Sequence, residues 1–205
     1  MTADPRQQKK WLTTMPKKIT EALKSSIMKI VPAHKDSLDS FLIMFKLTGG
    51  NYNGQTHILQ MITNNHKNIL YPITAPGLTF LSDILHPNVA PNGHICLDIL
   101  KPEAWSPVLS IETIVSVIIT LLDDPNPSSP LDDITGKLYT KCNKMYTTNN
   151  KNLTIVEQTE LYKKCFSDYV LAVNSYYKKN TKIKQYLYYF DEIEVTKDIS
   201  EMKIN

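Results

Sequence analysis

The stretch "SFLIMFKLTGGNYNGQTHILQMI", residues 40–62, holds two apolar runs separated by a cluster of turn-forming residues. In the first run Phe41, Ile43, Phe45 and Leu47 alternate with other residues, which places them on one face of a β-strand. The cluster GGNYNG supplies glycine and asparagine, which adopt turn conformations readily. THILQMI is then the returning strand, so the stretch predicts an antiparallel pair.

The segments on either side extend this pair into a larger unit. Residues 64–77 hold two prolines, a glycine and polar residues typical of a loop, and LTFLS from Leu78 predicts a third short strand. Before the pair, Thr14 can cap a helix with Pro16 in its first turn. The apolar residues of this helix, at helical spacing, are Ile19, Leu23, Ile27 and Ile30. We therefore expect a helix followed by an antiparallel meander.

Between residues 86 and 107 no periodicity holds, while His, Pro, Asn and Gly recur. Ordered loops of this length inside a compact domain are uncommon and are usually functional. Cys96 lies in this segment soon after PNGH, so it is a candidate nucleophile; the alternative is a buried packing residue. His86 is a weaker candidate for a catalytic base, and a hydrogen bond that braces the loop is the alternative.

The remainder of the chain predicts helices. Ser110 opens one whose apolar residues are Ile111, Ile114, Val115, Ile118 and Leu122 on one face, with Val117, Ile119 and Leu121 on most of the rest. A helix that is apolar nearly all round is expected to be buried. The sequence DDPNPSSP ends it, because proline excludes helix and restricts the residue before it.

Two further helices follow, and the chain continues past them with helical spacing. The first has the stripe Leu131, Ile134, Leu138, Cys142 and Met145. A capping box of Thr154 and Glu157 begins the second, whose stripe is Tyr162, Cys165, Phe166, Tyr169, Val170, Val173 and Tyr177. Cys142 and Cys165 thus fall on core faces, where cysteine behaves as a small hydrophobe. Beyond residue 180, the residues that recur at helical spacing are Ile183, Tyr186, Leu187 and Phe190.

Composition limits the classes of function. The chain has 205 residues, 42% hydrophobic and 21% charged, which is ordinary for one globular domain with a tail. Arg6 is the one arginine, so nucleic acid is an improbable partner, because phosphate and base recognition favour arginine. The N-terminus lacks the apolar run of a secretory signal, and VLSIETIVSVIITLL is too short and polar to cross a bilayer. The three cysteines show neither metal-ligand spacing nor an even set. We expect a cytosolic or nuclear protein without a membrane partner.

Five motifs carry a resemblance to a known family. They are YPITAP from Tyr71, HPN at 86–88, NGHICLDIL from Asn92, WSP at 105–107 and DPNPSSPL from Asp124. In this order, and with this spacing from His86 to Cys96, the chain resembles a ubiquitin-conjugating enzyme from about residue 14 to residue 178. The resemblance implies an α+β fold with an N-terminal helix, a four-stranded antiparallel meander sheet and C-terminal helices. It divides the chain into a catalytic core, 14–178, and a C-terminal extension, 179–205.

The same resemblance implies a chemistry for the 86–107 segment. Cys96 is expected to accept ubiquitin, or a relative of it, from an activating enzyme as a thioester and to pass it to a protein lysine or a ligase. No metal or organic cofactor is implied. Asn88 is the candidate amide donor to the oxyanion, with a loop-bracing role as the alternative. Asp98 and Ser129 match positions near the approach of the acceptor lysine, although Asp98 could equally cap local backbone and family members often carry an acidic residue in place of Ser129.

Partner surfaces are implied as well. The first helix, with Lys17, Lys18 and Lys24 expected to be exposed, resembles the surface offered to the activating enzyme; a merely solvated lysine face is the alternative. The positions that match the two ligase-contacting loops are Ile73, Pro107 and Val108. Ile73 departs from the phenylalanine common at its position. Two rival functions remain open: a catalytically dead ubiquitin-binding scaffold, and a conjugating enzyme for another ubiquitin-like protein.

Overall fold

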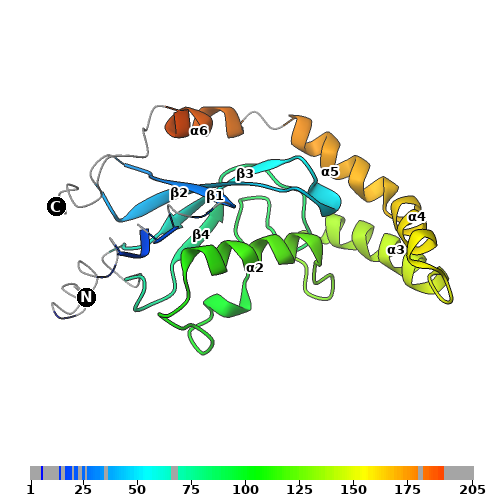
Figure 1. Cartoon of the computed structure of the whole chain (residues 1–205), viewed down its shortest axis with the longest axis horizontal. Helices are drawn as coiled ribbons and strands as arrows, with labels where there is room; N and C mark the ends of the chain where they lie inside the picture. The colour runs from blue at the N-terminus through cyan, green and yellow to red at the C-terminus, as the bar shows by residue number, and fades with distance from the viewer. Residues whose placement is uncertain are drawn as a thin grey trace.

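A four-stranded antiparallel sheet forms the centre of the molecule in the computed structural model. The structure describes residues 6, 14, 17–19, 21–22, 25, 27–34, 37–65, 69–179 and 182–191. The strands, in spatial order, are β1 Met28–Pro32, β2 Ser40–Lys46, β3 Thr56–Ile62 and β4 Gly77–Phe80. The helices are α2 Ile111–Asp123, α3 Asp133–Asn149, α4 Ile155–Cys165, α5 Ser167–Lys179 and α6 Lys182–Asp191. Helix α2 lies on one face of the sheet and α6 on the other, while α3 and α4 extend from one end (Figure 1). The α+β fold with a four-stranded meander is confirmed.

The antiparallel pair of β2 and β3 is the centre of the sheet. Its inward-facing cross-strand pairs are Phe41 with Met61, Ile43 with Leu59 and Phe45 with His57. All six side chains are buried, so the period-two alternation correctly predicted the core face of both strands. The turn between them contains a short 3₁₀ helix, η1 Gly50–Tyr52, in which Gly50 has a φ of +65°. The three predicted strands, including β4, are confirmed.

The first strand replaces the end of the predicted first helix. Residues 17–19, 21 and 22 are helical, with Ile19 and Ala22 buried, but Met28–Pro32 is β1. The prediction that Ile27 and Ile30 lie on the helical stripe is therefore wrong, and Leu23 lies outside the described residues. Ile30 pairs with Ile43 of β2 and is buried against the sheet core. A three-residue spacing of isoleucines fits a helix locally, but pairing with a neighbouring strand determines the structure.

Helix α2 packs its predicted face into the core. The side chain of Ser110 accepts a hydrogen bond from the Thr113 amide, which caps the helix as expected. All five residues of the predicted apolar face are buried. Val117, Ile119 and Leu121 are only half-buried, and Glu112 and Thr120 face solvent. The prediction that α2 is buried on all sides is therefore wrong. It is an amphipathic helix at the edge of the core.

The predicted stripe of α3 is wrong at most of its positions. Ile134 is 82% exposed and Met145 is 46% exposed. Cys142 of the stripe is buried as predicted, and the other buried residues of the helix are Thr135, Gly136 and Tyr139. A Cβ at Gly136 would lie 2.9 Å from the Pro130 side chain, so a small residue allows this close approach. Small and aromatic residues, rather than the aliphatic ones, define the packed face.

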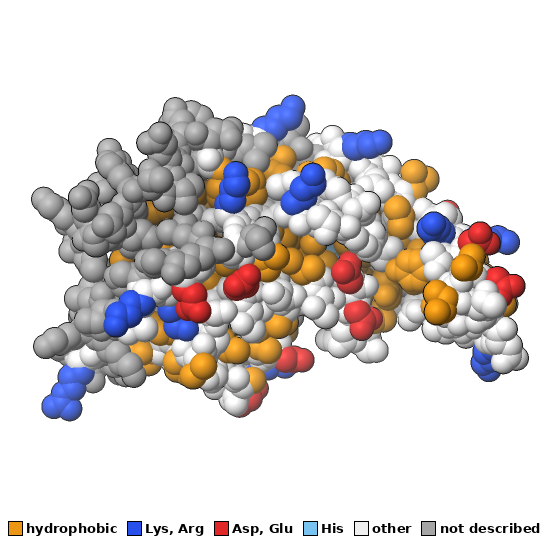
Figure 2. All heavy atoms as spheres, viewed as in Figure 1, with side chains coloured by type: hydrophobic (Ala, Val, Ile, Leu, Met, Phe, Trp, Pro, Cys, Tyr) orange, Lys and Arg blue, Asp and Glu red, His pale blue; other side chains and the backbone are white. Residues whose placement is uncertain are grey.

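The second C-terminal stripe extends over two helices instead of one. The capping box of Thr154 and Glu157 is confirmed at the start of α4, and the chain passes through Phe166 into α5. The buried residues of this pair are Cys165, Phe166, Tyr169 and Val173, as predicted. Cys142 and Cys165 are both buried free thiols, which confirms them as core residues. Ile155, Val156 and Leu171 remain exposed, and Figure 2 shows hydrophobic side chains gathered at this end.

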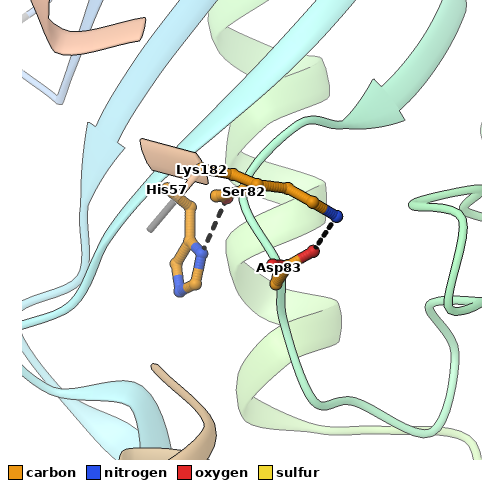
Figure 3. A network of polar contacts seen from close by, with 4 residues as sticks. All are labelled: His57, Ser82, Asp83 and Lys182. Carbon is orange, nitrogen blue, oxygen red and sulfur yellow. Dashed lines mark hydrogen bonds and ion pairs between the residues drawn. The ribbon is translucent and has the colours of Figure 1, made fainter. Parts of the chain in front are cut away.

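Helix α6 covers the face of the sheet opposite α2 (Figure 1). The buried residues of this second cluster are Val31, Leu42, Ile58, Ile183 and Phe190. Lys182 Nζ lies 2.5 Å from Asp83 Oδ1 at the start of the helix, and the neighbouring Ser82 hydroxyl lies 3.1 Å from His57 Nδ1 (Figure 3). The predicted helical continuation is confirmed over residues 182–191. No helix in the described ranges is long and apolar enough to cross a membrane.

Replacing Ile183 by alanine should destabilise the protein by about 2 kcal/mol, because Ile183 is 9% exposed and the change removes buried methyl groups. Urea unfolding measures the effect. The matched control is Ile155→Ala in α4, where the side chain is 83% exposed and the expected change is below about 0.5 kcal/mol. Equal losses in the two variants would contradict the docking of α6.

Candidate active site

Cys96 lies on the surface between the end of β4 and helix α2. Cys96 is exposed, whereas Cys142 and Cys165 are buried. A groove of about 340 Å³ runs past it, lined by residues 76–79 around the start of β4, by residues 94–97, and by Leu100 and Lys101. The candidate nucleophile is therefore reachable by a large reactant, and its alternative as a buried packing residue is wrong.

A tight turn before Cys96 fixes its position relative to the sheet. Gly93 has a φ of +84°, and a Cβ there would lie 2.1 Å from the carbonyl oxygen of Phe80. The Phe80 amide donates to the Gly93 carbonyl at 2.9 Å, and the Ala90 amide donates to the His94 carbonyl at 2.9 Å. Only glycine fits this approach without strain. The turn thus attaches the cysteine segment directly to the edge of β4.

His86 is a buried structural residue. The Asn88 amide donates to His86 Nδ1 at 2.9 Å, so the ring proton resides on Nε2, which donates to the Leu121 carbonyl at 3.0 Å. Burial lowers the pKa of His86 to about 4. The ring is therefore neutral, with both nitrogens occupied. This geometry matches the bracing alternative for His86 and leaves it no free nitrogen for a base.

Asn88 joins the HPN segment to the loop after α2. Its Nδ2 donates to the carbonyls of Asn126 at 2.8 Å and Ser129 at 3.2 Å, and its Oδ1 accepts from the Asn126 amide at 2.8 Å. Both amide hydrogens are thus engaged by backbone, and the residue is buried. The geometry is that of a loop brace. The oxyanion role stays a prediction, and it requires one of these hydrogens to leave its carbonyl.

Asp98 and Ser129 both lie on the surface, one on each of these segments. Asp98 begins a short 3₁₀ helix, η2 Asp98–Leu100, two residues after Cys96. Ser129 belongs to the loop that Asn88 braces. Their exposure is compatible with a position beside an incoming acceptor, and their roles stay predictions.

Lys101 is a site residue that the motif comparison did not identify. It lines the same groove as Cys96, and its Nζ lies 2.6 Å from Asp98 Oδ1. The hydrogen bond to Asp98 raises the pKa of Lys101, and the negative charge of Asp98 raises it further. The three-residue spacing from Asp98 to Lys101 was the sequence signal for this pair.

The two loops proposed to contact ligases lie against each other. Trp105 Nε1 donates to the Pro72 carbonyl at 3.0 Å, and its ring packs 5.8 Å from the ring of Tyr71. The loop that carries half-buried Ile73 is thereby tied to the one that carries Val108, which is 87% exposed. Pro107 is exposed as well. The three residues form a surface that a partner can reach.

The first helix contacts the same two loops through Lys18. Lys18 Nζ donates to the Leu109 carbonyl at 2.8 Å and lies 5.6 Å from the centre of the Tyr71 ring. Burial lowers the pKa of this lysine. The expectation that Lys18 is fully exposed is therefore wrong, because it is half-buried; Lys17 is exposed, and Lys24 lies outside the described residues.

No group of three or more His, Cys, Asp or Glu side chains within the described part of the chain is arranged to hold a metal ion. The reactive group that the site offers is a thiol. A thiolate attacks an activated carbonyl, and the thioester so formed can be passed on to another nucleophile.

Comparison with known proteins agrees with this geometry. Residues 8–154 match the model of the family described as ubiquitin-conjugating enzyme. A protein of Caenorhabditis elegans named ubiquitin-conjugating enzyme E2 1 is 41% identical over 91 residues, which are 44% of this chain and 46% of that protein. The alignment thus spans about half the length of the curated relative.

The two buried histidines make stability depend on pH. Burial lowers the pKa of His57 to about 3 and that of His86 to about 4, both below the unfolded value of about 6.5. Between these values the unfolded chain binds more protons, so the stabilisation is complete above pH 6.5 and is lost as the pH falls. We expect His86 alone to contribute about 3 kcal/mol to this loss.

Urea unfolding from pH 7.5 down to pH 4.5 measures the dependence. His86→Gln should reduce the slope of unfolding free energy against pH by about one proton. His34→Gln, at an exposed position, should leave the slope unchanged. A His86→Gln slope parallel to that of the parent protein would contradict a neutral, buried His86.

Proposed function

The chain belongs to the ubiquitin-conjugating enzyme family, and from this premise we propose that it carries ubiquitin or a ubiquitin-like protein as a thioester on Cys96 and transfers it to an amine. We assign the activity to residues 14–178, with 179–205 as a C-terminal extension. The observation that carries the proposal is the exposed thiol of Cys96 beside a groove, while the thiols of Cys142 and Cys165 are buried.

The chemistry proceeds in two transfers at one sulfur. In the first, the Cys96 thiolate attacks the thioester that joins the modifier to the activating enzyme, and the sulfur of that enzyme leaves. In the second, a lysine amine attacks the new thioester, the carbon–sulfur bond breaks and an isopeptide bond forms. The donor is already activated in both steps, so an ordinary thiol is sufficient.

The surrounding residues have proposed roles in the second transfer. We propose Asn88 as the amide that stabilises the oxyanion when the loop around Asn126 shifts, and Asp98 and Ser129 as the polar surface that the acceptor lysine approaches. Support comes from three contacts: Asp98 follows Cys96 by two residues, Val89 pairs with Ile95, and Asn88 donates to the Ser129 carbonyl. Asn88 also braces the loop, so the two roles act through one side chain.

Partners of the proposed reaction are an activating enzyme, ligases and protein substrates. We propose Lys17 and the first helix as the surface for the activating enzyme, and Ile73, Pro107 and Val108 as the surface for ligases. Lys18 ties these surfaces together through the Leu109 carbonyl. A cytosolic or nuclear location is proposed on the basis of three free thiols in one chain.

Two alternatives remain, and one observation favours the enzyme. A catalytically dead scaffold does not need an exposed thiol, whereas Cys96 is exposed beside a groove. A conjugating enzyme for another ubiquitin-like protein would use the same site. Charging reactions with purified activating enzymes and each modifier in turn identify which modifier the chain accepts.

Cys96→Ala should abolish the thiol-sensitive adduct formed with activating enzyme, modifier and ATP, because the other two thiols are buried. Cys96→Ser should give either an adduct that resists thiols or none. Non-reducing and reducing gels read the result. Cys142→Ala is the control and should still charge; a thiol-sensitive adduct on Cys96→Ala would disprove the assignment.

Asn88→Ala should slow discharge to free lysine roughly 100-fold, because one donor to an oxyanion contributes about 3 kcal/mol, while charging of Cys96 falls much less. Single-turnover rates of the two steps, measured on the folded variant, separate these effects. Asn126→Ala is the control for loop loosening, because it removes a side chain that accepts from the Ser128 amide but keeps Asn88. Equal losses in both steps would show that Asn88 only braces the loop.

A further inference from the structure

His94 lies on the same side of the chain as Cys96, two residues before it. Burial alternates along this segment: His94 and Cys96 are exposed, whereas Ile95 and Leu97 are buried. An antiparallel bridge from His94 to Thr79 of β4 holds the start of the segment. Successive side chains of an extended chain point to opposite sides, so the imidazole and the thiol point the same way. Their Cα atoms are about 7 Å apart in such a chain.

The imidazole ring of His94 is available for proton transfer. It lines the groove beside the thiol. The His94 amide donates to Asn92 Oδ1 at 3.0 Å, and its carbonyl accepts from the Ala90 amide at 2.9 Å, so its backbone is held in place. No described residue forms a hydrogen bond with the ring. The buried histidines differ, because both ring nitrogens of His57 and of His86 are engaged.

The other titratable groups beside the thiol are less suited to accept a proton. Of the described residues that line the groove, the titratable ones are His94, Cys96 and Lys101, and β4 contributes none, since its sequence is GLTF. Lys101 pairs with Asp98 of η2, and this hydrogen bond raises the pKa of Lys101 and keeps its amine protonated. An acceptor amine must lose a proton as it becomes an amide, and imidazole is the side chain that most often accepts one near neutral pH.

We propose that His94 is the general base of the second transfer: it accepts the proton that the acceptor amine loses as it attacks the thioester on Cys96. The inference rests on the proposed function of Cys96. His86 cannot fill this role, because its ring is buried and both nitrogens are occupied. The base acts on the attacking nitrogen, whereas the amide proposed for Asn88 acts on the oxyanion.

The proton transfers balance within the site. The neutral acceptor amine attacks the thioester carbonyl carbon, a carbon–nitrogen bond forms, and the proton on nitrogen passes to the unprotonated ring nitrogen of His94. The carbon–sulfur bond then breaks and Cys96 leaves as a thiolate. The imidazolium returns its proton to this thiolate or to water. Charging differs, because one thiolate replaces another and no amine loses a proton, so charging does not require His94.

His94→Gln should slow discharge of the charged full chain to free lysine about 100-fold, at the lower end of what a positioned base contributes. Charging by activating enzyme, ubiquitin and ATP should change less than about twofold, because that step moves no proton from nitrogen. Single-turnover rates of the two steps at pH 7.5 measure both effects. His34→Gln is the matched control and should discharge like the parent protein, because His34 is exposed and does not line the groove.

Chemical rescue distinguishes a base from a residue that only shapes the segment. Imidazole added to charged His94→Ala should accelerate discharge to lysine about tenfold, because it replaces the missing base. The same imidazole added to the charged parent protein and to charged Asn88→Ala measures its own attack on the thioester and should not accelerate formation of the lysine product. Iodoacetamide should alkylate uncharged Cys96 at the same rate in the parent protein and in His94→Gln, because the base acts on the amine.

Four outcomes would contradict the proposal. Normal discharge in a charged His94→Gln protein would disprove the base and leave the proposed function intact. Equal losses in charging and discharge, or slower alkylation of Cys96, would show that His94 acts on the thiol or on the segment. A His94→Ala protein that imidazole does not rescue would exclude a base at this position. A parent protein that forms no thioester on Cys96 would overturn the proposed function and this inference together.

Discussion

The long segment between β4 and α2 has little regular secondary structure, so its position depends on contacts with other parts of the chain. Three of its side chains supply such contacts. Asn88 reaches the loop after α2, His86 reaches the end of α2, and Trp105 reaches the loop before β4. Each contact joins the segment to a part of the chain more than 30 residues away in sequence. The exposed thiol, its groove and the partner surfaces all depend on these three contacts.

Local patterns predicted those parts of the fold that local forces determine. Alternation of apolar residues predicted β2 and β3. The capping residues Ser110 and Thr154 predicted the starts of two helices, because a cap is a contact between near neighbours in sequence. The pattern failed where tertiary packing decides. Ile30 lies in β1 and pairs with Ile43 of β2, and the buried face of α3 includes Gly136, where a Cβ would lie 2.9 Å from the Pro130 side chain.

The candidate site divides in the same way. The position of Cys96 in an accessible loop could be predicted, since turn residues precede it and no periodicity buries it. The partners of Asn88 could not, because they are backbone groups of a loop about 40 residues further along the chain, and no side-chain pattern identifies a backbone partner. The contact of Lys18 could not be predicted for the same reason: Lys18 was expected to be exposed, and its acceptor, the Leu109 carbonyl, is a distant backbone group.

Helix α6 converts the outer face of the sheet into an interior surface. Antiparallel sheets commonly leave one face in water, where polar residues are free to vary. Here Leu42 and Ile58 are buried by Ile183 and Phe190 from the far end of the chain. Substitutions at these strand positions are therefore coupled to substitutions in α6. A lineage that lost α6 would be under pressure to replace these strand residues with polar ones, and a lineage that kept it would retain both sets together.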